Sequence, residues 1–336
     1  MIKFYKIMFF ISMIMGTLIA ISSYSWLSMW MGLEINLLSI LPLLNEGKTF
    51  YSSESALKYF MTQALASSIL LFSIILSLNF SELLFFNTNF LSLVLNSALL
   101  TKMGAAPFHA WFPEVMEGLS WMNSLIMLTW QKIAPMIVLF YNLKFTFFII
   151  CIILISSIFS GILGLNQISL RKILAYSSIN HIAWMLAGML NTQMIWIIYF
   201  IIYSIITINI ILILKDFNIY YFNQLMNNLN YDKLSKFLFF MNFLSLGGLP
   251  PFLGFLPKWL VINNLIQENF YLLSFFLIIF TLITLFFYLR ITFSSLMINT
   301  SESLIFKPNS LSFSVMFFNF LSLGGLLACT LILSYF

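Results

Sequence analysis

The sequence predicts an all-α membrane protein of eleven transmembrane helices, two of them discontinuous and placed in inverted-topology repeats. Hydrophobic residues make up 62% of the 336 residues, charged residues make up only 7%, and the mean hydropathy is +1.03. A soluble domain carries roughly 25% charged residues, so lipid must be the solvent for most of this chain. The net charge of +5 is therefore interpreted by position relative to the membrane, and it does not indicate nucleic-acid binding.

Eleven apolar stretches are long enough to cross a bilayer, which takes about 20 helical residues. They show no polar alternation, so strands are not expected. The first stretch follows Lys3 and Lys6 and imitates a signal peptide, but many equally apolar stretches follow it. We therefore interpret it as an uncleaved first span. The expected spans are 4–22, 24–44, 54–79, 87–119, 122–143, 146–165, 169–190, 193–215, 232–267, 270–297 and 311–335.

The basic residues test this count, because eleven spans place the two termini on opposite faces. Nine of the 15 lysines and arginines then lie on the face of the N-terminus, and only Lys144 lies on the other face. An excess of this kind marks the inner face of a membrane protein. The nine are Lys3, Lys6, Lys48, Arg171, Lys172, Lys215, Lys233, Lys236 and Lys307.

Two of the stretches contain proline-rich interruptions, at 104–113 and 247–257. Both read Pro-Phe-x-x-aromatic-x-Pro, and their first prolines in this pattern, Pro107 and Pro251, lie 144 residues apart. Proline removes a backbone donor and clashes with the preceding turn, so each stretch should break into two half-helices. A break at membrane depth is tolerated only where it faces protein or water.

Each break follows three spans within its half of the chain, and five spans per half is an odd number. The second half then enters the membrane upside down, as in many transporters. We expect one membrane domain, 1–336, with a first five-helix repeat at 1–144, an inverted second repeat at 145–298 and an extra helix at 311–335. The alternative is a coincidence between two proline-rich loops.

Four ionisable residues lie deep in apolar spans: Glu34, Lys102, Lys132 and Lys258. Each costs roughly 2.5–3.5 kcal/mol at the bilayer centre, so four unpaired charges would cost about 10–14 kcal/mol. We expect them to face one another, polar groups or water.

A glutamate and a lysine that move together and apart change the proton affinity of the lysine, which is the physical basis of a proton relay. A structural ion pair is the alternative for Glu34 and Lys102. It explains Lys132 and Lys258 poorly, because no acidic residue remains for them in the predicted core.

Three further residues are candidates for proton transfer. His109, two residues after Pro107, and His181 have side chains that titrate near neutral pH. Lys58 begins a polar stripe on its span with Thr62, four residues later. Such stripes line hydrated paths or hold helices together, and a buried histidine is often a simple hydrogen-bonding group.

No pattern in the sequence indicates a soluble active site. There is no phosphate loop, dinucleotide fingerprint, haem-attachment motif or paired-histidine metal site. Two cysteines, Cys151 and Cys329, lie in apolar runs without partners at metal-ligand spacing. Redox chemistry coupled to this chain would take place elsewhere.

Five stretches together resemble the chain 2 family of NADH:ubiquinone oxidoreductase. These proteins are antiporter-like membrane subunits of respiratory complex I, encoded in mitochondrial DNA. The resemblance covers essentially the whole chain, and the combined motifs are highly specific. The stretches are 30–36 (WMGLEIN), 102–109 (KMGAAPFH), 130–135 (WQKIAP), 170–181 (LRKILAYSSINH) and 246–252 (LGGLPPF).

The resemblance implies that electron transfer from NADH to ubiquinone, in other subunits, drives proton pumping. It implies that Glu34 pairs with Lys102, that Lys132 is the central relay and that Lys258 lies on the second broken helix toward the exit. The chain resembles the animal version, which lacks the first three of fourteen spans.

The resemblance also implies the surroundings of the chain. The partners would be the other membrane-arm subunits of complex I, including antiporter-like and small ones, and the lipid of the inner mitochondrial membrane. The N-terminus would lie in the matrix and the C-terminus in the intermembrane space. NADH, FMN, iron–sulfur clusters and ubiquinone would be bound elsewhere in the complex, so we expect no cofactor bound by this chain, although its membrane surface could take a lipid such as cardiolipin. The alternatives are a stand-alone cation/proton antiporter and a structural subunit that conducts nothing.

Overall fold

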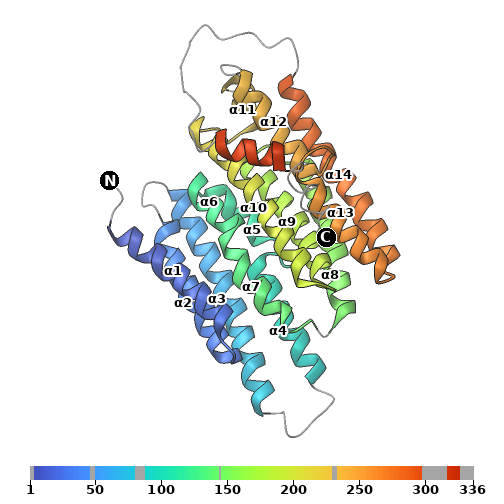
Figure 1. Ribbon diagram of the computed structural model, residues 1–336. Helices are drawn as coiled ribbons and strands as arrows, with labels where there is room; N and C mark the ends of the chain where they lie inside the picture. Colours follow the sequence, from blue (N-terminus) through green and yellow to red (C-terminus); the bar gives the residue numbers. More distant parts are fainter. Residues whose placement is uncertain are drawn as a thin grey trace. The chain divides into compact units, whose positions relative to one another are not determined.

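The computed structural model describes residues 4–45, 50–79, 88–143, 145–228, 233–296 and 316–325. Over these ranges the chain is helical, with no β-strand and one isolated β-bridge between Ser169 and Tyr221 (Figure 1). The helices are α1 (Phe4–Ser22), α2 (Trp26–Leu44), α3 (Phe50–Asn79), α4 (Thr88–Met103), α5 (Trp111–Gly118), α6 (Trp121–Leu128), α7 (Trp130–Phe140), α8 (Thr146–Leu165), α9 (Leu170–Met189), α10 (Gln193–Asp216), α11 (Phe222–Asn228), α12 (Lys233–Gly247), α13 (Phe255–Gln267), α14 (Tyr271–Leu296) and an unlabelled helix, Met316–Gly325.

The prediction of an all-α membrane protein is confirmed. Within the described ranges, seven helical stretches are long and apolar enough to cross a membrane, and three shorter apolar helices accompany them. The count of eleven spans stays a prediction, since much of the last one, 311–335, lies outside the described residues. Lys3, Lys48, Lys144 and Lys307, which the charge argument uses, also lie outside them.

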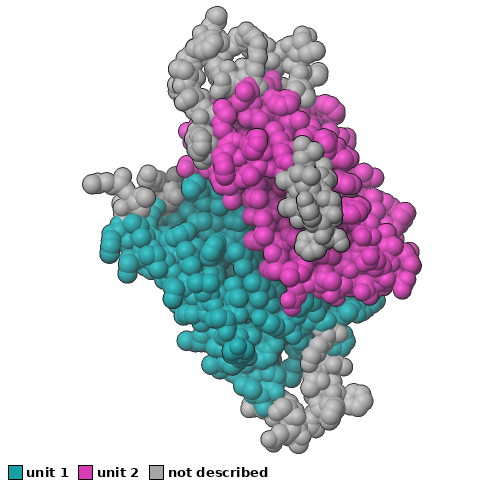
Figure 2. All heavy atoms as spheres, viewed as in Figure 1, with its two compact units in different colours: residues 1–152 teal, residues 153–336 magenta. Residues whose placement is uncertain are grey.

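The chain forms two compact units, Met1–Ile152 and Ile153–Phe336, with the boundary inside α8 (Figure 2). Each unit contains one of the two proline-rich interruptions. We call them unit 1 and unit 2. The predicted division into repeats at 144/145 stays a prediction.

Glycines let the first two helices of unit 1 pack backbone against backbone. A Cβ atom on Gly32 of α2 would lie 2.5 Å from the backbone nitrogen of Ala20, and one on Gly16 of α1 would lie 2.8 Å from that of Asn36. Close helix contact through small residues is the usual packing solution in lipid, where the hydrophobic effect does not drive helices together. This contact fixes the stretch of α2 that carries Glu34 and Asn36.

The two proline-rich interruptions have the same backbone geometry. Gly104 and Gly248 end α4 and α12 with positive φ angles of 74° and 78°, the conformation that glycine adopts at a helix C-terminus. Residues 104 and 105 donate to the carbonyls of 101 and 100, and residues 248 and 249 donate to those of 245 and 244. Each of these two hydrogen bonds in the first break therefore has a counterpart 144 residues away in the second. A cis peptide bond precedes Pro107 in the first break and Pro251 in the second.

The structure differs from the sequence prediction in the fifth span, expected as one helix over 122–143. The helix is interrupted at Thr129, whose φ of −113° and ψ of −72° separate α6 from α7. The N–H of Lys132 bonds the Thr129 carbonyl over three residues instead of four. Pro135 lacks an N–H group, so it also deprives the Gln131 carbonyl of its normal helical donor. Lys132 thus lies in an irregular stretch of backbone.

In unit 2, α9 is the central helix, and α10, α13 and α14 pack against it. Almost every residue of α9 is buried, from Leu170 at its first position to Met189 at its last. Arg290 of α14 donates to the carbonyls of Leu165 and Gln167 at the end of α8. A helix that is buried all round can hold polar side chains such as His181 away from lipid.

We predict that Gly32→Ala destabilises the protein by about 1–3 kcal/mol, because the added methyl group overlaps the backbone of α1. Thermal unfolding of the detergent-solubilised protein measures the effect. Gly324→Ala is the matched control, since a Cβ there meets no atom within 4 Å in the described part of the chain. Equal stabilities of the two variants would contradict the packing described here.

Candidate functional site

Three of the four buried charges predicted from the sequence lie in unit 1, and Lys258 lies in unit 2. Glu34 is partly buried in the middle of α2, whereas Lys102 in the last turn of α4 is 7% exposed and Lys132 in α7 is 2% exposed. Lys258, the fourth residue of α13, is 7% exposed. Each lysine lies within a few residues of an interruption in its helix, where backbone groups lose their usual helical partners.

Glu34 and Lys102 lie within electrostatic range of each other. In the described part of the chain they form no direct ion pair, and no protein group bonds the Lys102 Nζ atom. The Glu34 Oε1 atom is buried and has no hydrogen-bond partner among the described residues. Buried polar atoms are rarely left without partners, so this arrangement calls for water or for movement of one side chain.

An amide pair connects the two helices that carry Glu34 and Lys132. The Asn36 Nδ2 atom donates to the Gln131 Oε1 atom at 2.8 Å, and the Gln131 Nε2 atom donates back to the Asn36 Oδ1 atom at 3.1 Å. Both side chains are at least nine-tenths buried. Because Asn36 follows Glu34 by two residues and Gln131 precedes Lys132, the pair positions α2 and α7 at the level of both charges.

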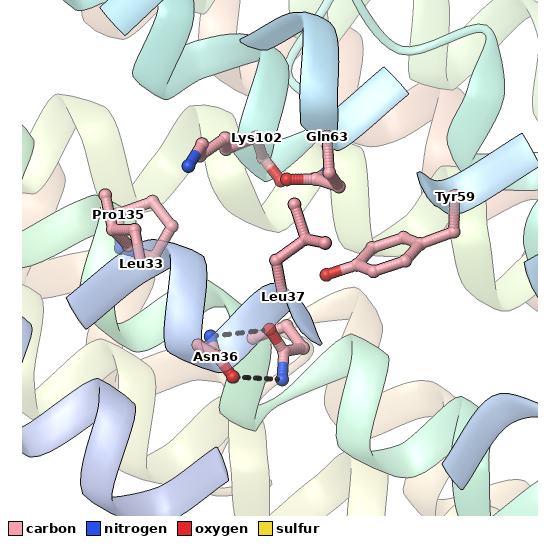
Figure 3. Close-up of a pocket in the computed structure, with 8 residues that line it drawn as sticks. Leu33, Asn36, Leu37, Tyr59, Gln63, Lys102 and Pro135 are labelled. Atoms are coloured by element: carbon pink, nitrogen blue, oxygen red, sulfur yellow. Dashed lines mark hydrogen bonds between the residues drawn. The ribbon is translucent and has the colours of Figure 1, made fainter. Parts of the chain in front are cut away.

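A small cavity lies beside this amide pair and against Lys102 (Figure 3). Its room of about 10 Å³ is close to what one water molecule requires. Tyr59 and Gln63, both from α3, also border the cavity, and the Gln63 side chain donates to the Lys102 carbonyl at 3.3 Å. A water molecule there would find several polar partners. The lining residues are Leu33, Asn36, Leu37, Tyr59, Gln63, Lys102, Gln131 and Pro135.

The ammonium group of Lys132 lies near an aromatic ring. Its Nζ atom lies 5.7 Å from the centre of the Phe112 ring of α5. An aromatic face attracts a cation, by an amount that grows when water is excluded. Phe112 lies eight residues after Gly104, so the first broken helix contributes both Lys102 and the ring that faces Lys132.

The side chain of Lys258 in unit 2 reaches across the second break and bonds the end of α12. Its Nζ atom donates to the carbonyls of Gly247 at 2.7 Å and Leu246 at 3.3 Å, at the end of α12. The C-terminal end of a helix carries partial negative charge, so it can hold an ammonium group without a carboxylate. Gly248 leaves the necessary space, because a Cβ there would lie 2.7 Å from the Lys258 Cδ atom.

The remaining candidates have different environments. His109 lies inside the first break, is 8% exposed and bonds the Pro107 carbonyl. The Lys58 side chain is 42% exposed and pairs with Glu54 at 3.1 Å and Glu114 at 2.9 Å. The structure therefore places Lys58 in a surface ion-pair cluster rather than in the buried group, although its neighbour Tyr59 borders the cavity.

His181 of unit 2 is 4% exposed, and its Nδ1 atom lies 2.9 Å from the Tyr199 hydroxyl oxygen.

Sequence reasoning did not assign a role to Tyr199, Tyr59, Asn36 or Gln131. The available signal was a polar or phenolic side chain within two residues of a buried charge, or inside an otherwise apolar helix. Within the described ranges, no group of three or more His, Cys, Asp or Glu side chains could hold a metal ion.

Residues 23–284 match the family described as "NADH:quinone oxidoreductase/Mrp antiporter, TM". NADH-ubiquinone oxidoreductase chain 2 of Anopheles gambiae is 52% identical over 330 residues, and the Aedes aegypti protein of that name is 54% identical over 330; both alignments cover 96% of this chain and 96% of the relative. A chain of respiratory complex I from Thermus thermophilus with bound aureothin has the same fold, with a TM-score of 0.88 at 23% identity. The structural alignment covers 99% of this chain and 80% of the Thermus chain.

We predict that Asn36→Leu lowers the stability of the protein by about 1–3 kcal/mol, because it leaves the Gln131 amide buried without its partner. The double variant Asn36→Leu, Gln131→Leu should recover part of this loss, since it removes both polar groups. Thermal unfolding of the two single variants and the double variant completes the cycle. Additive losses would show that the two amides do not act as a pair.

Proposed function

Because the chain belongs to the family of NADH-ubiquinone oxidoreductase chain 2, we propose that it is a core membrane subunit of respiratory complex I that translocates protons across the inner mitochondrial membrane. NADH-to-ubiquinone electron transfer in other subunits supplies the energy. The chain is then part of an H+-translocating reductase without carrying a redox centre itself. The residues that carry the protons are our own assignment.

One observation supports this assignment above the others: each buried lysine lies beside an interruption in its own helix. Lys102 precedes the first break by two residues, Lys132 follows Thr129 by three, and Lys258 follows Gly254 by four. Broken helices at membrane depth are typical of ion pathways, because unpaired backbone groups and water can solvate a moving charge there. A lysine whose only task was to hold helices together would need no such site.

In unit 1, we assign Glu34, Lys102 and Lys132 to one relay. Movement of the Glu34 carboxylate toward or away from Lys102 changes the electrostatic stabilisation of the ammonium form. The cavity beside Lys102, with room for about one water molecule, offers a hydrogen-bonded step toward the Asn36–Gln131 pair and α7. His109, inside the break that follows Lys102, is a further proton carrier on this side.

In unit 2, we assign Lys258 and His181 to the relay. The carbonyls of Leu246 and Gly247 hold the Lys258 amine in one position, and the amine can rotate away when it loses its proton. We place Lys58 at the start of the pathway, since it combines an exposed side chain with a neighbour, Tyr59, that borders the unit 1 cavity.

The matched breaks support an inverted repeat of two five-helix halves, 1–144 and 145–298, with a further helix at 311–335. Asn36 of α2 and Asn180 of α9 also lie 144 residues apart, and each bonds a later helix of its own unit: Asn36 bonds Gln131 of α7, and Asn180 bonds Thr284 of α14. On this proposal the eleven spans place the N-terminus in the matrix and the C-terminus in the intermembrane space. The predicted positive-inside bias supports that orientation.

The chain then assembles with the other membrane-arm subunits of complex I, including neighbouring antiporter-like and small ones. We propose that it binds no cofactor of its own, neither nicotinamide, flavin, iron–sulfur cluster nor quinone, and that a membrane lipid such as cardiolipin binds at its membrane surface.

We predict that Lys132→Met lowers proton transfer through this chain on the order of 10²-fold, the loss typical for removal of a proton-transferring group. Methionine keeps the volume of the lysine stem, so the complex should still assemble. Proton pumping by the assembled complex in liposomes, driven by NADH and quinone, is the measurement. Lys215→Met is the matched control, because Lys215 is exposed at the end of α10. Normal pumping by assembled Lys132→Met complex would favour a structural subunit.

The antiporter alternative has its own test. The chain reconstituted alone in liposomes with a sodium or potassium gradient should show no cation-driven proton movement. Exchange in this preparation, abolished by Lys132→Met, would instead support a stand-alone antiporter.

A further inference from the structure

His181 of unit 2 lies in a cluster of buried phenol rings. Its ring is 5.9 Å from that of Tyr199 and 4.9 Å from that of Tyr203, both measured between ring centres. His181 comes from the central helix α9, and both tyrosines come from α10, four residues apart and therefore on one helix face. All three side chains are at most 4% exposed. The histidine thus contacts two phenol rings in a buried site shielded from lipid.

The two phenols make different contacts. The Tyr199 hydroxyl lies 2.9 Å from the His181 Nδ1 atom, whereas the Tyr203 hydroxyl bonds Ser178 on α9. The contact that Tyr203 makes with the histidine is between the two rings. Removal of each hydroxyl in turn therefore distinguishes an effect on proton transfer at His181 from an effect on helix packing.

A hydroxyl suits a histidine that gains and loses a proton. It donates to the Nδ1 lone pair of the neutral ring, and after rotation it accepts from the Nδ1–H group of the cation. A carboxylate could only accept and an ammonium group could only donate. The Tyr199 hydroxyl keeps the Nδ1 atom of the buried ring paired in both states, so at this nitrogen neither state bears the cost of an unpaired buried polar atom.

We propose that Tyr199 is the positioning residue of His181, and that its reversible hydrogen bond lets His181 take up and release a proton inside unit 2. This inference rests on the proposed function, in which His181 belongs to the relay. Tyr199 need not carry a proton itself. Its task is to hold the ring orientation and to match the hydrogen bond to the charge.

The other titratable groups around the site come from the helices packed against α9. Tyr203 lies on α10 with Tyr199, and Tyr288 of α14 is near enough to both tyrosines to interact with them electrostatically. Lys258 of α13 lies 5.8 Å from the ring centre of Trp184, which follows His181 by three residues on α9. A proton on Lys258 is therefore a change of charge close to the stretch of α9 that carries His181.

The test is the pH dependence of proton pumping by assembled complex with Tyr199→Phe. Loss of the hydroxyl should weaken the cation more than the neutral ring, because hydrogen bonds to charged groups are the stronger ones. The acidic limb of the pumping profile should then move to lower pH by about one unit, a tenfold change in proton affinity. Tyr203→Phe is the matched control, and its profile should stay unshifted.

A second pair of measurements separates the possible failures. Adding Tyr199→Phe to His181→Gln should cause no further shift if the tyrosine acts through the histidine. Normal pumping by His181→Gln would show that His181 does not belong to the relay and would overturn this inference. It would not overturn the proposed function, which Lys132→Met tests separately. An unshifted profile in assembled Tyr199→Phe complex would overturn the role of Tyr199.

Density maps of the unmodified complex at acidic and alkaline pH give a readout that does not depend on any variant. The His181 Nδ1 atom and the Tyr199 oxygen should stay within hydrogen-bond distance, below about 3.2 Å, in both maps. Separation of the two atoms at either pH would overturn the proposal.

Discussion

A charge inside an apolar helix bundle must be solvated by something, and this requirement organises the structure. Lipid offers no hydrogen bonds, so each ionisable side chain needs a carboxylate, a carbonyl, an aromatic face or a water molecule. The chain meets the requirement differently at each lysine. Lys258 bonds two carbonyls at a helix end, Lys132 faces the Phe112 ring, and Lys102 combines the nearby charge of Glu34 with a cavity of about one water. Weak or exchangeable partners of these kinds suit a group that must release a proton again.

The helix interruptions make this solvation possible. A regular helix uses all of its carbonyls internally, and none would remain for the Lys258 amine. Gly248 combines two requirements in one residue, since it adopts a positive φ angle and leaves room for the lysine stem. The close contact between Gly16 and Gly32 has a related effect in unit 1, because it fixes the part of α2 where Glu34 faces the interior. The irregular backbone of this fold therefore lies where charged side chains are buried.

Composition and proline pattern were enough to predict helices, their approximate bounds and both proline-rich breaks, because these depend on local chemistry. The four charges were also visible as exceptions in apolar runs. Partners distant in sequence were not predictable: Asn36 and Gln131 lie 95 residues apart, and nothing local indicates that Lys258 would bond the end of α12. The interruption at Thr129 was missed, since threonine followed by a proline six residues later is compatible with a continuous kinked helix. The surface position of Lys58 was not predictable either, since its partner Glu114 lies 56 residues away in the sequence.

The central claim is that water, rather than a direct salt bridge, connects the buried charges of unit 1. A density map of the assembled complex at a resolution that shows ordered water tests it most directly. The account predicts a water molecule in the cavity bordered by Tyr59, Gln63 and Lys102, within hydrogen-bond distance of the Lys102 Nζ atom. A dry cavity, with Lys102 bonded directly and permanently to Glu34, would contradict it.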